Sequence, residues 1–371
     1  MSGGAYAAAG VDVEAGERAV ALMRTSVAAT HRTGVIGDVG GFAGLFDLSQ
    51  FAHMKRPVLA TSTDGVGTKI AVARALDIHH TIGIDLVAMV VDDLVVCGAE
   101  PLFMTDYIAV GAVVPERIAA IVSGVAEGCR QAGCALVGGE TAEHPGLMAP
   151  DEYDIAGAGT GIVDADDLLG PERVTSGDVV IAMASSGLHS NGYSLARRVL
   201  LGDGGPGLSA RVPELGRTVG EELLEPTRIY SLDCLALARA VPTHAFSHVT
   251  GGGLAANLAR VLPAHLAADI ERSTWTLPPV FDVIARTGAV SQEDMERTFN
   301  MGIGMVAIVP AMSEAAALDL LRSRGLDAWT CGTVRDRRDG ESGDAEAKGG
   351  KGGAVSLVGR QPVGRSSSSS S

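Results

Sequence analysis

A phosphate-binding turn is the first chemistry that the sequence suggests, in the stretch LATSTDGVGTKIAVAR at 59–74. An apolar run ends at Asp64 and Gly65, and Thr68 and Lys69 come directly before a helical pattern. A strand, a tight turn and a helix bring backbone N–H groups to a phosphate, Lys69 adds a positive charge, and Asp64 offers a cation ligand. The order of residues differs from a Walker A motif. A capped turn uses the same residue types, so both interpretations stay open here.

Three aspartates interrupt the apolar segment TIGIDLVAMVVDDLVVCGAEP, in which 81–97 is predicted to be a helix. Asp85 and Asp92 are seven residues apart and share a helix face, and Asp93 lies about a quarter-turn round. The rest of the helix is almost wholly apolar, so it should be buried, and buried carboxylates need partners. The segment holds no Lys or Arg, so a divalent cation is the favoured partner.

A second carboxylate turn follows a predicted short strand at 135–137, where Gly139 and Glu140 stand in the sequence LVGGETAEHPG. Glu140 could complete a carboxylate cluster with Asp64 and Asp93. The alternative is a carboxylate that only stabilises the positive end of a helix.

The second half contains two further turns that lead from a strand into a helix. In SSGLHSNGYSL, the side chains of His189, Ser190 and Asn191 supply hydrogen-bonding groups suited to a sugar phosphate, although a capped loop needs the same types. In HVTGGGLAANLARVLP, Thr250, Gly251 and Gly252 precede a helix whose N-terminus suits a phosphate.

These motifs need a framework of alternating helices and strands. The pattern predicts a first α/β (α+β) domain at 1–170, in which 57–61 is a buried strand, and a second domain at 171–335. The polar stretch 164–178 marks the boundary. After residue 335 the composition changes to charge, Gly and Ser, which predicts a disordered tail at 336–371.

Composition excludes several classes of protein. The chain has 371 residues and a formal net charge of −15, which disfavours non-specific binding to nucleic acid. Five cysteines in no zinc-binding spacing suggest a reduced, cytoplasmic setting. The N-terminus shows no secretory signal pattern, and aspartates interrupt the most apolar stretch, so no membrane span is expected.

Several long segments together resemble one family, the phosphoribosylformylglycinamidine cyclo-ligases, also called aminoimidazole ribonucleotide (AIR) synthetases. They are TSTDGVGTK, HTIGIDLVAMVVDDLVVCGAEP, LVGGETAEHPG, SSGLHSNGYSL, EPTRIY, HVTGGGLAANLARVLP and MERTFNMGIGM. The likeness runs from about residue 10 to residue 334. It implies a two-domain AIR-synthase-like fold and a homodimer in which the N-terminal sheets form a shared barrel. It also implies ATP-dependent ring closure of formylglycinamidine ribonucleotide to aminoimidazole ribonucleotide.

The resemblance assigns roles to the motif residues. It implies Asp64, Asp93 and Glu140 as Mg²⁺ ligands, and Gly65, Thr68, Lys69 and Gly139 as contacts of ATP, with Gly40, Gly41 and Phe42 in a loop over the nucleotide. It implies His189, Ser190, Asn191, Thr250, Gly251 and Gly252 on the substrate side. Asp64, Lys69 and His189 are the expected catalytic residues, with His189 as the candidate for proton transfer.

Four positions depart from the family pattern. Asp92 replaces a usual asparagine, Met301 a frequent cysteine, and GGFAGLF a typical GGFGALF. The lysine that commonly precedes the Gly-rich loop is missing, and His31 or Arg32 is expected to stand in.

Other members of the superfamily, and one protein of another class, are the alternatives. Selenophosphate synthetase and the hydrogenase-maturation protein both need cysteines that this chain lacks at the required places. Formylglycinamidine synthetase is much longer. Thiamine-monophosphate kinase is the second enzyme candidate, and a non-catalytic nucleotide-binding scaffold represents a different class.

Overall fold

The computed structural model describes residues 12–37, 40–345, 347 and 349–362. The chain divides into two compact units. Unit 1 contains residues 1–168 and 223–235, and unit 2 contains residues 169–222 and 236–371. The first change of unit falls two residues before the predicted boundary at 170, whereas the return of 223–235 to unit 1 was not predicted.

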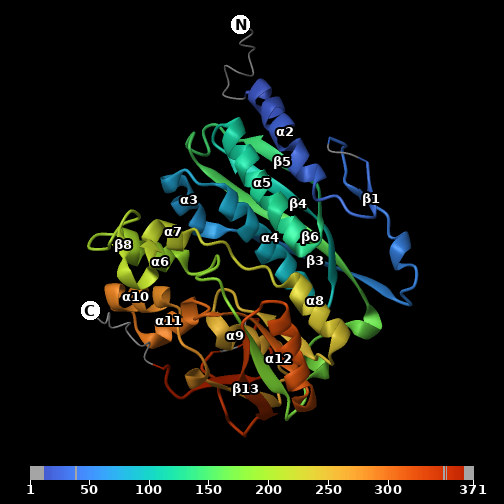
Figure 1. Ribbon diagram of the computed structural model, residues 1–371, viewed down its shortest axis with the longest axis vertical. Helices are drawn as coiled ribbons and strands as arrows, with labels where there is room; N and C mark the ends of the chain where they lie inside the picture. Colours follow the sequence, from blue (N-terminus) through green and yellow to red (C-terminus); the bar gives the residue numbers. More distant parts are fainter. Residues whose placement is uncertain (1–11, 38–39, 346, 348, 363–371) are drawn as a thin grey trace. The chain divides into compact units, whose positions relative to one another are not determined.

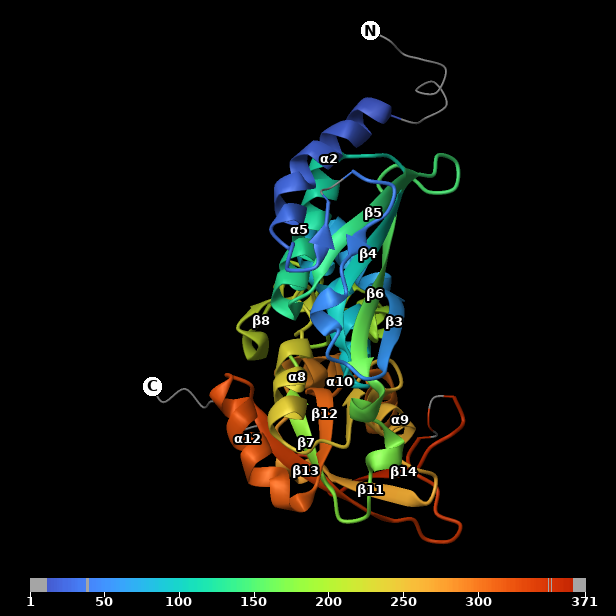
Figure 2. The ribbon, with the colours of Figure 1, turned by 90° about the vertical axis from the view of Figure 1, so that its right-hand side faces the viewer.

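Unit 1 is a four-stranded sheet with helices on one face (Figures 1 and 2). The strand order is β3-β6-β4-β5, in which β4 and β5 are parallel and the other pairs antiparallel. The helices are α2 (Val13–Ala28), α3 (Ile70–Leu76), α4 (His80–Val95) and α5 (Pro115–Ala132). The strands are β1 (Val35–Ile36), β2 (Leu45–Phe46), β3 (Pro57–Gly65), β4 (Glu100–Val110), β5 (Ala135–Glu143) and β6 (Tyr153–Asp164).

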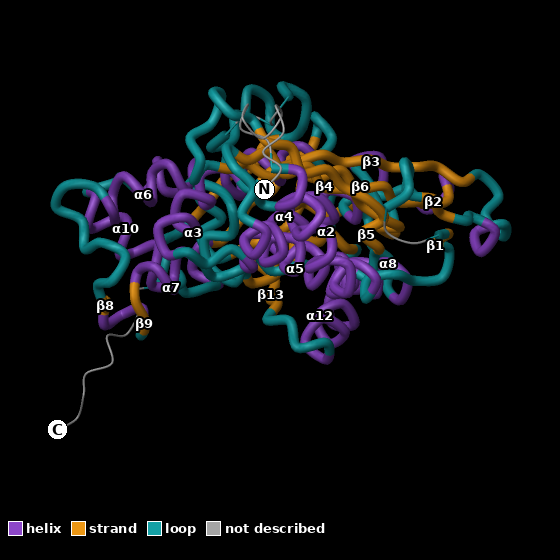
Figure 3. The backbone as a smooth tube through the Cα atoms, turned by 90° about the horizontal axis from the view of Figure 1, so that it is seen from above, coloured by secondary structure: helices purple, strands orange, loops and turns teal. Residues whose placement is uncertain are grey.

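Helix α4 packs closely on β6 because β6 presents glycines to it. A Cβ atom on Gly159 would lie 2.6 Å from Cγ1 of Val90 and 3.2 Å from Cδ1 of Leu94, both on α4. The first distance is too short for any larger residue. Figure 3 shows α2, α4 and α5 gathered beside strands β3 to β6.

Strand β3 corrects one prediction about this sheet. Residues 57–61 were predicted to form a buried strand, but β3 is an edge strand whose side chains alternate in exposure, and Leu59 is 59% exposed. The sequence run is apolar without alternation, so its pattern alone did not reveal the edge position. The strand also continues to Gly65, so Asp64 lies within it.

Unit 2 contains a six-stranded sheet in the order β10-β12-β7-β13-β11-β14. Its strands are β7 (Val179–Ala184), β10 (Ala245–His248), β11 (Leu266–Glu271), β12 (Ile303–Val309), β13 (Ala328–Asp336) and β14 (Ala354–Val358), with β8 (Arg211–Val212) and β9 (Arg217–Thr218) apart. Its helices are α6 (Tyr193–Leu201), α9 (Gly253–Arg260), α10 (Pro279–Gly288), α11 (Gln292–Thr298) and α12 (Glu314–Ser323). Helices α7 (Val219–Leu223) and α8 (Ser231–Ala240) cross the changes of unit.

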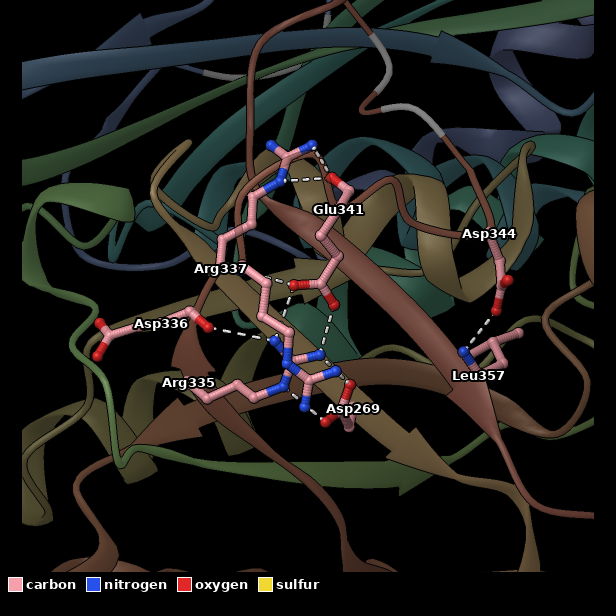
Figure 4. Close-up of polar contacts among 8 residues, drawn as sticks. Asp269, Arg335, Asp336, Arg337, Glu341, Asp344 and Leu357 are labelled. Carbon is pink, nitrogen blue, oxygen red and sulfur yellow. Dashed lines mark hydrogen bonds and ion pairs between the residues drawn. The ribbon is translucent and has the colours of Figure 1, made fainter.

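The described residues after 335 include strand β14 (Ala354–Val358), which corrects the prediction of a disordered tail at 336–371. Strand β14 pairs in parallel with β11 at the edge of the sheet. Arg335 holds the segment, because its guanidinium donates to Asp269 at 2.7 Å and to Glu341 at 2.9 Å (Figure 4). Arg335 lowers the pKa of the Glu341 carboxyl to about 2. The low-complexity composition concealed the short apolar strand AVSLV, and residues 363–371 lie outside the described residues.

Among the described residues, no helix is both long enough and apolar enough to cross a membrane.

Candidate active site

A cavity of about 600 Å³ lies in unit 1 between α2, strand β5 and the Gly-rich loop that contains Gly40, Gly41 and Gly44. Gly40 and Gly41 of the loop line it, as do Gly139 and Glu140 of β5. The structure therefore brings together four residues that the sequence placed in one nucleotide site. Phe42 was predicted beside them, but its side chain is fully exposed and does not line the cavity.

His31 and Arg32, the two residues expected to replace the lysine that usually precedes the Gly-rich loop, differ in their surroundings. His31 lines the cavity. Arg32 is bonded elsewhere, since its guanidinium donates to Glu100 at 2.8 Å and to the carbonyl of Gly133 at 2.7 Å. Of the two, only His31 is placed to contact a ligand in the cavity.

Asp106 of β4 also lines the cavity and was not among the predicted site residues. Its Oδ2 is buried and has no hydrogen-bond partner among the described residues. Burial raises the pKa of this carboxyl to about 7. Gly139 leaves the space that Asp106 occupies, because a Cβ there would lie 1.8 Å from Oδ1. Asp106 is the lone charge in the apolar run PLFMTDYIAV, a signal that could have identified it as it did Asp85.

The raised pKa of Asp106 predicts that the free energy of unfolding of the nucleotide-free protein depends on pH. The folded pKa lies above the ordinary 3.8, so the stabilisation is complete below about pH 4 and is lost as the pH rises through 7. Asp106→Asn is therefore expected to raise the free energy of unfolding at pH 8 by on the order of 2 kcal/mol, and to change it much less at pH 4.5. Urea unfolding at both pH values, with exposed Asp167→Asn as control, measures this; an equal effect at both values contradicts it.

The three carboxylates predicted to bind one Mg²⁺ do not meet within one chain. Asp64 lies on β3 and Glu140 on β5, the two opposite edges of the sheet. Three interstrand spacings of about 4.8 Å separate these edges, which is roughly 14 Å. Asp93 is exposed on α4. The Gly139–Glu140 pair lies inside β5, whereas a turn after residue 137 was predicted.

The residues of the unit still suit Mg²⁺ next to a nucleotide. Within the described ranges, no group of three or more His, Cys, Asp or Glu is placed to hold a metal. Magnesium usually takes one or two carboxylates, several waters and the phosphates of its nucleotide. Glu140 is exposed, and Asp106, which lines the same cavity, has a carboxylate oxygen without a hydrogen-bond partner in the described part of the chain, so these two carboxylates fit the usual donor set of Mg²⁺.

The buried aspartates of α4 have protein partners, which corrects the expectation that a cation pairs with them. Asp85 lies 2.9 Å from Nζ of Lys69, and its Oδ1 accepts from the backbone N–H of Thr227 at 2.7 Å. Asp92 accepts from the backbone N–H of Tyr230 at 3.0 Å. The partners are distant in sequence, so a search within the helix segment did not find them. Lys69, predicted to contact a phosphate, is completely buried in this structure.

In unit 2, three turns meet at one end of the sheet. Strands β7 and β10 flank β12 and both are antiparallel to it, so their last residues, Ala184 and His248, lie beside Ile303 and Met305 at the start of β12. The turns that follow β7 and β10 therefore approach the turn that precedes β12. A Cβ atom built on Gly251 would lie 3.4 Å from Oδ1 of Asn191, which places two predicted substrate residues together.

Two asparagines that the sequence analysis did not single out hold these turns. Nδ2 of Asn300 donates to the carbonyl of Gly187 at 2.9 Å, and its Oδ1 accepts from the N–H of Gly302 at 2.8 Å. Nδ2 of Asn257 donates to the carbonyls of Thr250 at 3.2 Å and Gly253 at 2.8 Å. Both asparagines lie within motifs that were quoted, so only their roles were missed.

His189 is held in an unusual conformation inside its turn. Its φ of 62° lies in the left-handed region, and its side chain is 2% exposed. Nε2 accepts from the backbone N–H of Ser186 at 3.1 Å, so the neutral ring carries its proton on Nδ1. A left-handed non-glycine residue is costly and is often found at functional sites.

Family models match both units. The model described as AIR synthase related protein, N-terminal domain, matches residues 47–163, and the corresponding C-terminal domain matches residues 175–344. Fold and site thus define a two-domain AIR synthase related protein.

Curated relatives are similar over nearly their full length. The phosphoribosylformylglycinamidine cyclo-ligase of Anaeromyxobacter sp. (strain Fw109-5) is 54% identical over 330 residues, which cover 89% of this chain and 95% of that protein. The protein of the same name from Shouchella clausii (strain KSM-K16) is 51% identical, with the same coverage of 89% and 95%. The chain belongs to the phosphoribosylformylglycinamidine cyclo-ligase family.

Solved structures share the fold at low identity. A thiamine-monophosphate kinase from Stenotrophomonas maltophilia K279a has a TM-score of 0.65 and 21% identity, covering 90% of this chain and 95% of that one. A hydrogenase maturation protein HypE in complex with ATP has a TM-score of 0.59 and 20% identity, covering 94% and 96%. At these identities the likeness extends to the fold alone, so the sequence relatives determine the family.

Proposed function

We propose that this protein closes the imidazole ring of aminoimidazole ribonucleotide from formylglycinamidine ribonucleotide, with conversion of ATP to ADP and phosphate, in purine biosynthesis in the cytoplasm. The observation that carries the proposal is the 54% identity to a curated cyclo-ligase over 95% of its length. The thiamine-monophosphate kinase alternative is supported only by a shared fold at 21% identity.

The cavity of unit 1 is the proposed nucleotide site. Five carboxylates line it, those of Asp12, Glu17, Asp106, Glu140 and Glu143. A polyanion such as ATP is repelled by so much negative charge unless a cation accompanies it. Bound Mg²⁺ would neutralise charge on the phosphates and so assist phosphoryl transfer, with Glu140 and Asp106 as its proposed protein ligands in this cavity.

The glycines and Asp64 then have defined tasks in the proposal. Gly40, Gly41 and Gly139 let the nucleotide approach the backbone, and Gly65 and Thr68 bind phosphate oxygens beside Asp64. Asp64, Asp93 and Glu140 share one site only across two copies of the chain, because Asp64 and Glu140 occupy opposite sheet edges. Leu59 and Tyr107 are 59% and 43% exposed on this sheet. A second copy that covers the sheet would close the predicted barrel and complete the site.

Unit 2 supplies the proposed substrate site. Ser190, Asn191 and the turn Thr250–Gly251–Gly252 offer hydrogen bonds to the ribose phosphate. ATP transfers its γ-phosphoryl group to the formamide oxygen, the amidine nitrogen attacks the same carbon, and the C–O bond breaks as phosphate leaves. The attacking nitrogen belongs to the same molecule, so the enzyme mainly orients it and excludes water. His189 is the proposed acceptor of the proton that the nitrogen loses, which requires that its Nε2 first be released from the N–H of Ser186.

One assay tests the proposal. Purified protein receives Mg-ATP with either formylglycinamidine ribonucleotide or thiamine monophosphate, and ADP and the organic product are both measured. We expect one aminoimidazole ribonucleotide per ADP in the first arm and no product in the second. ADP without imidazole in the first arm overturns ring closure, and thiamine diphosphate in the second arm supports the kinase.

A further inference from the structure

Three residues from different motifs form one buried polar cluster, which we call the Lys69 cluster: Lys69, Asp85 and Thr227. Lys69 and Asp85 are both 0% exposed and lie 2.9 Å apart. Nζ of Lys69 also donates to the carbonyl of Glu225 at 2.6 Å. Thr227 donates to Oδ1 of Asp85 from its backbone N–H at 2.7 Å and from its hydroxyl at 2.5 Å. A buried charge pair needs hydrogen bonds to offset its desolvation, and here those to Asp85 converge on its Oδ1, while its Oδ2 is buried without a hydrogen-bond partner among the described residues.

The cluster joins three parts of unit 1. Lys69 ends the 3₁₀ turn η2 (Gly67–Lys69), which is separated from Asp64 and Gly65 of β3 by one residue. Asp85 lies on α4, and Thr227 lies on the 223–235 segment, which leaves unit 2 and returns to unit 1 for thirteen residues. Hydrogen bonds from Tyr230 to Asp92 and from Ser231 to the carbonyl of Ala132 attach the same segment further along.

We propose that Lys69 is a positioning residue: the Lys69 cluster attaches residues 64–68 to α4 and to the 223–235 segment. This attachment presents Asp64 and Thr68 to the nucleotide. This proposal rests on the proposed function. Gly67 and Thr68 are exposed, whereas the Lys69 ammonium is enclosed by Asp85 and a carbonyl. An ammonium in that setting does not reach a phosphate unless the buried Asp85 loses its partner, which is costly.

Paired substitutions distinguish an anchor from a phosphate contact. Lys69→Met leaves the Asp85 charge buried without its partner, whereas Lys69→Met with Asp85→Asn removes both charges and keeps an oxygen for the Thr227 donors. We expect Lys69→Met to lower the midpoint of thermal unfolding by roughly 10 °C, and the double variant to recover most of that loss. At a temperature where circular dichroism shows each variant folded, Lys69→Met should lower kcat about tenfold with KM for Mg-ATP changed less than twofold, and the double variant should restore kcat to within about threefold of wild type.

Thr227→Val is the milder second variant, useful if Lys69→Met fails to fold. It removes one hydroxyl donor to Asp85 and leaves Lys69 intact, so it should lower kcat in the same way but less. Exposed Lys55→Met is the matched control and should behave as wild type.

Each contrary result overturns the proposal. If the double variant is stable and yet as inactive as Lys69→Met, with KM for Mg-ATP raised tenfold or more, that result would identify Lys69 as a phosphate contact. Single variants with wild-type kcat, whether destabilised or not, show that the cluster does not position the turn. Titration calorimetry with Mg-ATP and thermal unfolding do not depend on turnover. The anchor can therefore be tested even if the wild-type protein fails to close the ring.

Discussion

Replacement of Asp64 by asparagine is expected to lower the rate of ring closure by roughly two orders of magnitude, because a charge that we propose holds the cation on ATP is lost. The protein should stay folded. Oδ1 of Asp64 accepts the N–H of Gly65 at 2.7 Å, and an asparagine oxygen accepts the same bond. The free energy of unfolding should change by less than about 1 kcal/mol. Steady-state kinetics and urea unfolding measure the two effects, with Asp167→Asn as an exposed control. Near-wild-type turnover would remove Asp64 from the site.

Mixed oligomers test whether Asp64 acts across two chains. Asp64→Asn and Glu140→Gln chains should each be inactive alone. If one site takes Asp64 from one copy and Glu140 from the other, a mixed dimer has one intact site and one doubly altered site. Random mixing should then restore roughly a quarter of wild-type activity. No recovery after unfolding and joint refolding, with dimers shown by analytical ultracentrifugation, would place both carboxylates in the site of a single chain or outside it.

The sequence predicted the class of fold and most of the elements, because their patterns are local. The predicted helix at 81–97 corresponds to α4, and the predicted strand at 135–137 is the start of β5. The edge position of β3 and the strand β14 were not predicted, since both depend on what lies beside them in the sheet. The return of 223–235 to unit 1 is a contact between distant segments, which no local period encodes.

The candidate site shows the same division between local and distant information. Motif order brought Gly40, Gly41, Gly139 and Glu140 to one cavity. The buried aspartates were correctly inferred to need partners, but those partners were a lysine from one motif and backbone donors from another. The position of each side chain relative to the protein surface also determines whether Lys69 and Asp106 can contact a ligand. Lys69, which was predicted to contact a phosphate, is buried inside the protein. Asp106, which was not predicted as a site residue, lines the cavity.

Gly139→Ala is expected to raise the dissociation constant of Mg-ATP at least tenfold. An added Cβ would lie 1.8 Å from Oδ1 of Asp106 and 3.2 Å from its carbonyl oxygen, so the carboxylate must leave its place in the cavity. Displacement of a packed group should also lower the free energy of unfolding by roughly 1 to 3 kcal/mol. Isothermal titration calorimetry and urea unfolding measure both effects.

The neighbouring glycine provides the control for this substitution. At Gly138, which lines the same cavity, a Cβ would meet its nearest neighbour, Cγ2 of Thr105, at an ordinary 3.8 Å, so Gly138→Ala should unfold like wild type. Gly139→Ala combined with Asp106→Ala removes the clash. This double variant should regain stability and yet bind Mg-ATP weakly, because the carboxylate is absent. If it binds as tightly as wild type, Asp106 is not a ligand of the nucleotide's cation. If Gly139→Ala alone binds normally, the cavity is not the nucleotide site.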